Sequence, residues 1–187
     1  MVHTEVIENG EVATRPLRSA KATDILLLDG TGPIIWEPRF TYHGFRYVQV
    51  EGWPTETPLD GGYISAIVVH SNMERIGYFE TSNKDLNQFH NNVLWSMKGN
   101  FLGVPTDCPQ RDERLGWTGD AHAFMPTANY LYDASGFWRA WLKDSWSEQS
   151  VGNYMVPPFY IPSVSLFSRY RPVVSFQAVL CPNKIHL

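Results

Sequence analysis

The chain has 187 residues, of which 43% are hydrophobic and 18% charged, and this composition is typical of a globular protein with a core. The formal net charge of −4 disfavours nucleic acid and acidic membrane surfaces as partners, because neither attracts an acidic protein. The N-terminal residues are polar, and the longest apolar run, residues 25–28, is far too short to cross a bilayer. We therefore expect a cytoplasmic location.

The cysteine and histidine content predicts neither a disulfide framework nor a cofactor. Cys108 and Cys181 lack the paired spacing of a zinc site, and each is expected to be a free thiol. Three histidines in strand or helix contexts, His43, His70 and His90, are interpreted as packing or surface residues. We expect no metal and no cofactor.

Residues 1–72 have the pattern of short strands. Asp24–Leu28 and Ile34–Trp36 flank the turn-forming sequence Asp29-Gly30-Thr31-Gly32-Pro33, which predicts a hairpin. Val48 and Val50 then alternate with polar residues, and Tyr63–Val69 is rich in β-branched residues. The fold class is therefore mixed: a partial β-sandwich over 1–72, a connector over 73–81, and helices after it.

Helical periodicity begins near Ser82, which with Asp85 resembles a capping box. The pattern predicts helices over Ser82–Gly103, Asp120–Tyr132 and Ser135–Glu148, all within a helical region 82–150. In the third helix an aromatic stripe is expected to belong to the core; it contains Phe137, Trp138, Trp141 and Trp146.

The tail from Gln149 to Leu187 differs in composition from the rest of the chain. It contains no Asp or Glu, and its net charge is +3 against −7 for the preceding residues. Five prolines interrupt it, so it is not expected to pack as long helices. Residues 151–187 are either a native proline-rich extension or an out-of-frame sequence, and the pattern does not separate the two.

The polar segment Asp107–Asp120 contains four carboxylates, two arginines and a tryptophan in fourteen residues, and three interpretations compete. It is a loop whose surface charges neutralise one another, or a metal site made by Asp107, Asp120 and His122, or part of a glycosidase site. The third interpretation needs a carboxylic acid that neighbouring carboxylates keep protonated, and Glu113 has such neighbours. Arg111 suits a sugar hydroxyl and a carboxylate together, and Trp117 offers a face for a deoxy sugar.

The run Gly103–Asp120, with its sequence Asp107-Cys108-Pro109-Gln110-Arg111-Asp112-Glu113-Arg114-Leu115-Gly116-Trp117, resembles the signature of bacterial α-L-rhamnosidases, glycoside hydrolase family 78. Trp36–Tyr47 and Gly52-Trp53-Pro54 are similar to the end of the β-sandwich that precedes the catalytic domain of that family. The resemblance covers residues 20–150. It implies the opening helices of an (α/α)₆ barrel and inverting hydrolysis of terminal α-L-rhamnosyl residues from glycosides or polysaccharides.

By this resemblance Glu113 is the general acid, and Asp107, Arg111, Trp117 and Asp120 contact the substrate. Asp107 and Asp120 are expected to bind rhamnose hydroxyls and Trp117 to pack near the C6 methyl. Asp112 is interpreted as structural or electrostatic, and Cys108 as a buried thiol.

An inverting enzyme also needs a carboxylate base, which in this family is a glutamate far downstream. The sequence has no candidate after Glu148, so we expect the chain alone to be inactive. The alternative is a sugar-binding or structural remnant that does not catalyse. The aglycone, the linkage preference and the oligomeric state are not indicated by any sequence pattern.

Overall fold

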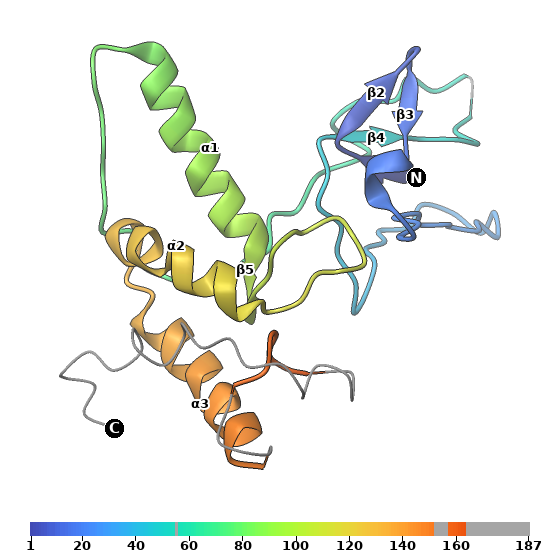
Figure 1. The fold of residues 1–187 in the computed structure, drawn as a ribbon. Coiled ribbons are helices and arrows are strands. Elements are labelled where there is room, and N and C mark those ends of the chain that lie inside the picture. Colours follow the sequence, from blue (N-terminus) through green and yellow to red (C-terminus); the bar gives the residue numbers. More distant parts are fainter. Residues whose placement is uncertain (55, 152–156, 164–187) are drawn as a thin grey trace. The chain divides into compact units, whose positions relative to one another are not determined.

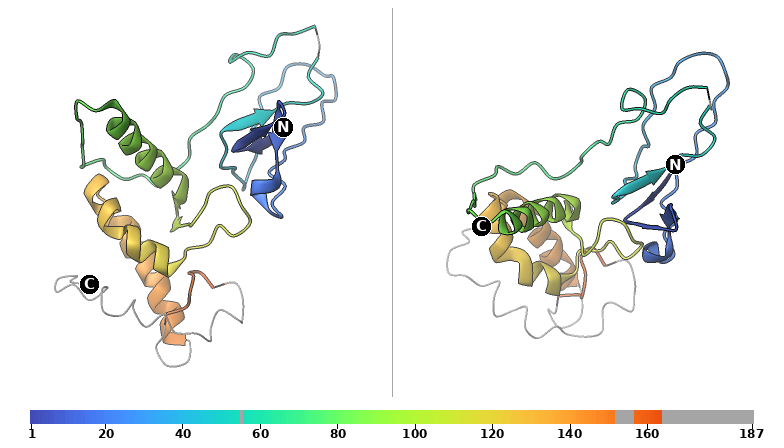
Figure 2. Two further views of the ribbon diagram at one scale, coloured as in Figure 1. Left: turned by 45° about the horizontal axis from the view of Figure 1, so that its top comes forward. Right: turned by 90° about the horizontal axis from the view of Figure 1, so that it is seen from above.

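The computed structural model describes residues 1–54, 56–151 and 157–163, and they form two compact units. The N-terminal unit comprises Met1–Val68 and Cys108–Arg114. The helical unit comprises Val69–Asp107 and the described residues from Leu115 onward. Figures 1 and 2 show the strands of the first unit in blue and cyan and the helices α1, α2 and α3 of the second in green to orange. The division places residues 108–114 with the strands, although they follow α1 in the sequence.

Two short antiparallel ribbons form the framework of the N-terminal unit. Strand β1 (Val2–Thr4) pairs with β4 (Tyr47–Gln49), and β2 (Val6–Glu8) pairs with β3 (Glu11–Ala13). Asn9 and Gly10 join β2 to β3 with φ angles of 54° and 85°, as an Asn-Gly hairpin turn requires. The fully buried hydroxyl of Thr4 donates to the carbonyl of Ala13 at 2.5 Å and so connects the two ribbons.

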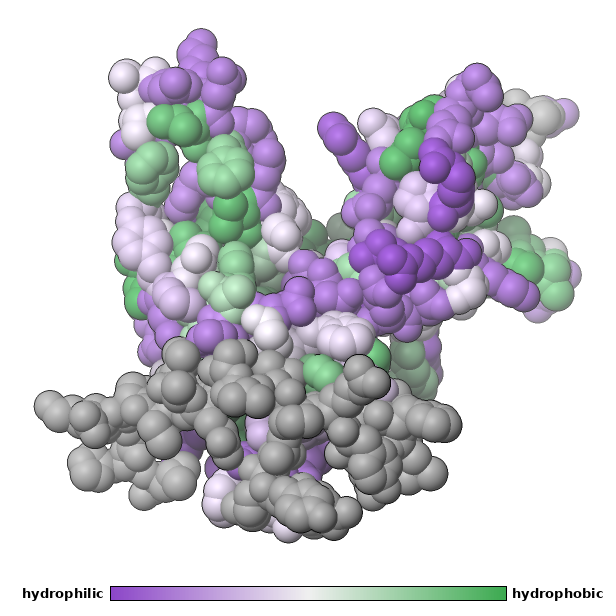
Figure 3. Space-filling model, viewed as in Figure 1, coloured by the Kyte–Doolittle hydropathy of each residue, from purple (hydrophilic) through white to green (hydrophobic). Residues whose placement is uncertain are grey.

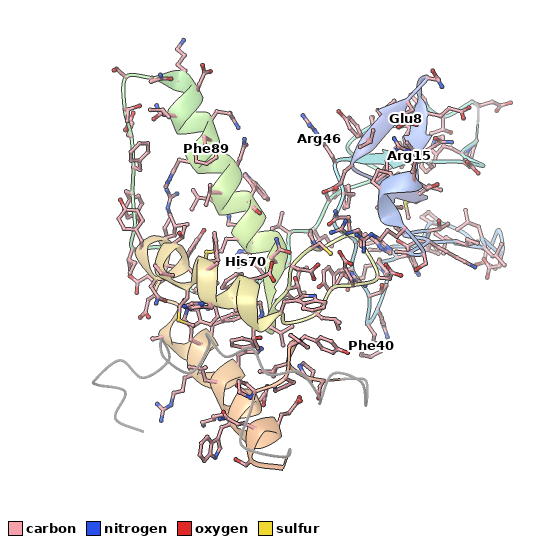
Figure 4. The ribbon with its side chains drawn as sticks, viewed as in Figure 1. Glu8, Arg15, Phe40, Arg46, His70 and Phe89 are labelled. Carbon is pink, nitrogen blue, oxygen red and sulfur yellow. The ribbon has the colours of Figure 1, made fainter. Side chains whose placement is uncertain are left out.

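A 3₁₀ turn, η1 (Arg15–Leu17), follows β3 and buries Leu17 completely. Beside it the exposed side chains of Glu8 and Arg15 meet at 2.7 Å, a pair visible in Figure 4. Such an exposed pair contributes little to stability, because both side chains lose freedom and water screens the charges.

Three strands predicted from the sequence are wrong. Asp24–Leu28, Ile34–Trp36 and Tyr63–Val69 have no strand pairing, and their apolar side chains are largely exposed, with Leu27 at 88% and Ile35 at 106%. A strand needs a paired neighbour and a cover for its apolar face, and the described residues supply neither to these segments. The turn between the first two is present, since Asp29 Oδ1 accepts hydrogen bonds from the amide and hydroxyl of Thr31.

The three predicted helices are confirmed, with shifted ends: α1 is Lys84–Asn100, α2 is Thr118–Leu131 and α3 is Ser135–Val151. The N-cap of α1 is Asn83 and not Ser82, because the Asn83 side chain accepts from the amides of Asp85 and Leu86. After α1 the short strands β5 (Phe101–Leu102) and β6 (Val104–Pro105) pair around Gly103.

The core of the helical unit is strongly aromatic. Its buried residues are Leu94, Met97, Phe101, Ala121, Ala128, Leu131, Tyr132, Ala134, Phe137, Trp138, Trp141 and Ile161. The predicted core positions Trp138 and Trp141 are confirmed, whereas Trp146 is 61% exposed. Trp146 follows Trp141 by five residues, about 140° further round the helix, and the small Ser145 takes the inward position instead.

The predicted connector 73–81 lies along the end of α2. The amides of Ile76 and Gly77 both donate to the carbonyl of Leu131 at 3.0 Å, and the amide of Asp133 donates to Glu74. The connector is therefore bonded into the helical unit.

One part of the predicted tail packs into the helical unit. Residues 157–163 form no helix, but Pro157 and Pro158 are buried and Ile161 is fully buried in the core. Residues 152–156 and 164–187, on which most of the tail prediction falls, lie outside the described residues.

Several large apolar side chains of the helical unit are exposed. On α1 they include Leu86, Phe89 and Trp95, at 48%, 65% and 59%. Figure 4 labels Phe89, and Figure 3 shows apolar surface over this helix. No helix in the described part of the chain is long and apolar enough to cross a membrane.

Candidate active site

The segment Cys108–Arg114 is held by residues 42–44 of the N-terminal unit. The amide of Gly44 donates to the carbonyl of Pro109 at 3.1 Å, and a Cβ on Gly44 would lie 2.6 Å from the Pro109 ring, so this approach requires glycine. Arg114 donates from Nη1 to the carbonyl of Tyr42 at 2.8 Å and lies 4.6 Å from the centroid of the Tyr42 ring. These contacts fix the backbone on which Glu113 stands.

Both carboxylate oxygens of Glu113 contact guanidinium groups. Arg111 Nη2 lies 2.6 Å from Oε1, and Arg18 Nη1 contacts Oε2. The side chains of Arg111 and Glu113 are 30% and 28% exposed, whereas that of Arg18 is 58% exposed. The Arg111 pair is the more sheltered, and a charge-assisted contact of this kind orients the carboxylate strongly.

The neighbouring Asp112 has a different environment. It is exposed, and its carboxylate accepts a hydrogen bond from the hydroxyl of Ser19. The side-chain amide of Gln110 donates a hydrogen bond to the carboxylate of Glu5 at 2.9 Å. Asp112 and Gln110 therefore attach the segment to the first twenty residues, while Glu113 is held mainly by the arginines.

The other predicted site residues belong to the helical unit. Asp107 is half-buried and accepts from the amide of Leu115 at 3.3 Å. Trp117 is the N-cap residue of α2, and its ring packs edge-on against Tyr160 with the centroids 5.2 Å apart. Asp120 lies exposed in the first turn of α2, where the helix dipole favours a negative charge.

The start of α2 is fixed by the segment 157–163. The amide and the fully buried hydroxyl of Thr118 donate to the carbonyl of Phe159 at 2.8 and 2.9 Å. The carbonyl of Ile161 accepts from the indole of Trp141, and the amide of Ile161 donates to Gly116. Gly116 has no room for a Cβ, which would lie 2.2 Å from the Ile161 carbonyl oxygen. This packing sets the position of Trp117.

The structure bears differently on the three interpretations of the segment 107–120. Arg18 and Arg111 neutralise Glu113, as the surface-charge interpretation expects. Within the described residues, Asp107, Asp120 and His122 do not bring three ligand atoms together, so the metal interpretation of these residues receives no support. Cys108 is 4% exposed, which confirms the prediction of a buried thiol.

Sequence reasoning missed several residues that shape this region. Tyr42 and Gly44 lie within the run Trp36–Tyr47, whose resemblance to the family implies no role for either residue. Arg18 and Tyr160 carry no local pattern that connects them to the segment 107–120, because their contacts arise from tertiary packing.

The sequence matches two family models that together cover nearly the whole chain. Residues 1–70 match the bacterial α-L-rhamnosidase concanavalin-like domain, and residues 74–186 match the bacterial α-L-rhamnosidase six-hairpin glycosidase domain. An α-L-rhamnosidase of Formosa agariphila is 41% identical over 156 residues, which are 83% of this chain and 17% of that protein.

Solved structures that resemble this chain are also α-L-rhamnosidases. The native α-L-rhamnosidase of Aspergillus terreus is 64% identical with a TM-score of 0.87, over 91% of this chain and 20% of that one. The Streptomyces avermitilis α-L-rhamnosidase complexed with L-rhamnose is 42% identical with a TM-score of 0.81, over 88% and 16%. The matched residues and their fold are thus those of a family of glycoside hydrolases.

The chain belongs to the bacterial α-L-rhamnosidase family and contains residues that match both its concanavalin-like domain and its six-hairpin domain. It covers about a fifth or less of the length of the relatives described above.

Proposed function

We propose that the chain carries the proton-donating part of an α-L-rhamnosidase, with Glu113 as the general acid of inverting hydrolysis. The observation that carries this proposal is the fixed carboxylate of Glu113, which Arg111 holds at 2.6 Å on a segment tied to Tyr42 and Gly44. A general acid must protonate the departing glycosidic oxygen from a defined position, and this anchoring supplies one.

The proton transfer requires one free oxygen on Glu113. Arg18 is the contact that gives way, since its side chain is 58% exposed, whereas the more sheltered Arg111 stays to orient the acid. Arg111 has further donors for a sugar hydroxyl, so it can hold substrate and acid together.

The sugar contacts are proposed for residues of the helical unit. The exposed carboxylate of Asp120 and the half-buried one of Asp107 suit rhamnose hydroxyls, because carboxylates accept strong hydrogen bonds from them. The ring of Trp117, braced by Tyr160, offers an apolar face to the C6 methyl group. The relative solved with L-rhamnose supports this choice of sugar.

The helices α1, α2 and α3 are proposed as the opening helices of an (α/α)₆ barrel. The exposed Leu86, Phe89 and Trp95 of α1 need an apolar cover, which further helices of such a barrel would provide. The carboxylate base that activates water is proposed to come from the remainder of a complete family member, about 6.5–9.5 Å from the acid.

The test is Glu113→Gln in a complete enzyme that carries these residues, with Asp112→Asn as the matched control. Loss of general acid catalysis lowers turnover about 10²–10⁴-fold, and the loss is largest for rhamnosides with poor leaving groups. Asp112→Asn removes the charge of an exposed carboxylate, while its amide oxygen can still accept from Ser19, so the variant should retain most of the activity. Equal losses in the two variants, or a Glu113→Gln loss that ignores the leaving group, would contradict the assignment.

A second pair of variants distinguishes the roles of Arg18 and Arg111. Arg18→Gln should keep turnover within about threefold of the wild type, whereas Arg111→Gln should lose at least about tenfold, because a charge-assisted contact in a sheltered place orients the acid. Binding of L-rhamnose is measured beside hydrolysis. A complete enzyme that binds rhamnose but hydrolyses no rhamnoside would favour the sugar-binding alternative.

A further inference from the structure

Three potential metal ligands from distant parts of the sequence meet in the N-terminal unit: His3, Asp24 and His43. One ligand atom from each side chain lies within 4.8 Å of the others. The side chains are 9%, 12% and 15% exposed, so the cluster is largely sheltered from water. None of the three belongs to the proposed catalytic residues.

Hydrogen bonding indicates which tautomer the His3 ring adopts. Its Nδ1 lies 3.0 Å from the carbonyl oxygen of Ala22, and a carbonyl accepts only, so Nδ1 carries the proton. In the neutral ring Nε2 then bears a lone pair. Nε2 faces Asp24 Oδ2 at 3.9 Å, which places two acceptor atoms opposite each other. A cation between them would satisfy both.

His43 completes the arrangement from the other side of the carboxylate. Its Nε2 lies 3.1 Å from Asp24 Oδ1, and its ring stacks on that of His3 with the centroids 4.4 Å apart. A metal ion would displace the proton of this hydrogen bond, as metal binding to histidine generally does. His43 would then coordinate the ion through the lone pair of Nε2, in the neutral tautomer whose single ring proton is on Nδ1.

The backbone holds the ligands in place before any ion binds. The amide of His3 donates to Ala22 at 3.0 Å, and His3 is paired with Val48 in the register of β1 and β4. The hydrogen bond from His3 Nδ1 to a backbone carbonyl is the kind of contact that orients a histidine ligand in metal proteins. The site is thus preorganised on one side by β1.

We propose that His3, Asp24 and His43 form a binding site for a divalent transition-metal ion, and that Zn²⁺ is the ion they suit best. Two imidazole nitrogens and one carboxylate oxygen are typical zinc ligands, whereas Ca²⁺ requires six or more oxygens. Tetrahedral bonds of about 2.0–2.1 Å place neighbouring ligand atoms about 3.3 Å apart. The observed separations are 3.1 Å from His43 Nε2 to Asp24 Oδ1 and 3.9 Å from His3 Nε2 to Asp24 Oδ2, both near this value although the two histidines face different oxygens of the carboxylate. Water would take the fourth position.

The ion would act as a cross-link within the N-terminal unit. It would join β1, the segment at Asp24 and the residues that lead into β4. The ribbon of β1 and β4 has just three residue pairs, so a metal bond between its flanking segments adds stability that the short pairing lacks.

The test uses the purified 187-residue protein stripped of metal with a chelator and titrated with ZnCl₂ alone by calorimetry. We expect one zinc per chain and a rise in unfolding temperature that added chelator reverses. His3→Gln, His43→Gln and Asp24→Asn should each weaken binding at least about tenfold. His70→Gln, a half-buried histidine of the helical unit, and Cys108→Ser, which removes a buried thiol, serve as controls and should bind as the wild type does.

A measurement on the wild type alone guards against variants that fail to fold. Zinc should protect two histidines from modification by diethyl pyrocarbonate, and peptide mapping should identify them as His3 and His43. The proposal is overturned if the wild type binds no zinc at about 100 μM, an affinity weaker than any structural site. Protection of other histidines, or loss of binding in the His70→Gln or Cys108→Ser control, would equally refute it.

Discussion

Replacing Gly116 by alanine should disrupt the packing of the segment 157–163 against the start of α2. The new Cβ would lie 2.2 Å from the carbonyl oxygen of Ile161 and 3.0 Å from the indole nitrogen of Trp141. Real Cβ contacts are not that short, and the obstacle is backbone, so Ile161 must move. Its two hydrogen bonds, to Gly116 and from Trp141, would break or lengthen.

The expected cost follows from these contacts. Two lost hydrogen bonds are worth about 2 kcal/mol together, and partial exposure of the fully buried Ile161 adds about 2 kcal/mol. The lower entropy of an unfolded chain with alanine returns about 0.4–1 kcal/mol. The net loss in the free energy of unfolding is therefore about 3–4 kcal/mol.

Urea unfolding followed by tryptophan fluorescence measures this loss, because Trp117 packs against Tyr160 and Trp141 donates a hydrogen bond to Ile161. Gly119→Ala is the matched control: its Cβ meets nothing within 4 Å in the first turn of α2, so it should be neutral or stabilise by up to about 1 kcal/mol. If Gly116→Ala stays within about 1 kcal/mol of the wild type, or matches Gly119→Ala, the packing argument fails.

Two further predictions concern helix starts. Asn83→Ala should cost about 1 kcal/mol of stability in urea unfolding, because Asn83 caps α1, whereas Ser82→Ala should cost almost nothing; the reverse order would restore Ser82 as the cap. Asp133 precedes α3, and its pKa is lowered mainly by a hydrogen bond from the hydroxyl of Ser135 and to a smaller extent by one from the amide of Ser135. Its stabilising contribution is therefore present above the unfolded pKa and is lost as the pH falls through the lower folded value, so Asp133→Asn should show a shallower loss of stability between about pH 5 and pH 2 than the wild type. Identical acid profiles for the two proteins would show that the contribution of Asp133 is negligible.

The helices were predictable because their signal is local. Apolar residues at helical spacing identified α1, α2 and α3 to within a few residues. The strands were not predictable in the same way, because a strand depends on a pairing partner elsewhere in the chain. Ile34–Trp36 has a strand-like sequence but no partner, whereas Val6–Glu8 is only three residues long, too short for a clear pattern, and forms β2 through the Asn9-Gly10 turn.

The candidate site was predictable where residues are adjacent in sequence. The pairing of Arg111 with Glu113 joins residues two apart within one motif. Arg18, which contacts the other oxygen of Glu113, stands 95 positions away, and no pattern in a single sequence connects the two. The cluster of His3, Asp24 and His43 was missed for the same reason, because each residue taken alone is an ordinary polar group.

The membership of Cys108–Arg114 in the N-terminal unit has a practical consequence for dividing the protein. A recombinant product that began at residue 69 would look like a natural helical domain by sequence. It would nevertheless deprive Glu113 of Arg18, and Arg114 of its Tyr42 partner. The shortest piece that retains the contacts of Glu113 therefore starts at or before residue 18, so domain exchange between family members should carry the strand region and the segment 108–114 together.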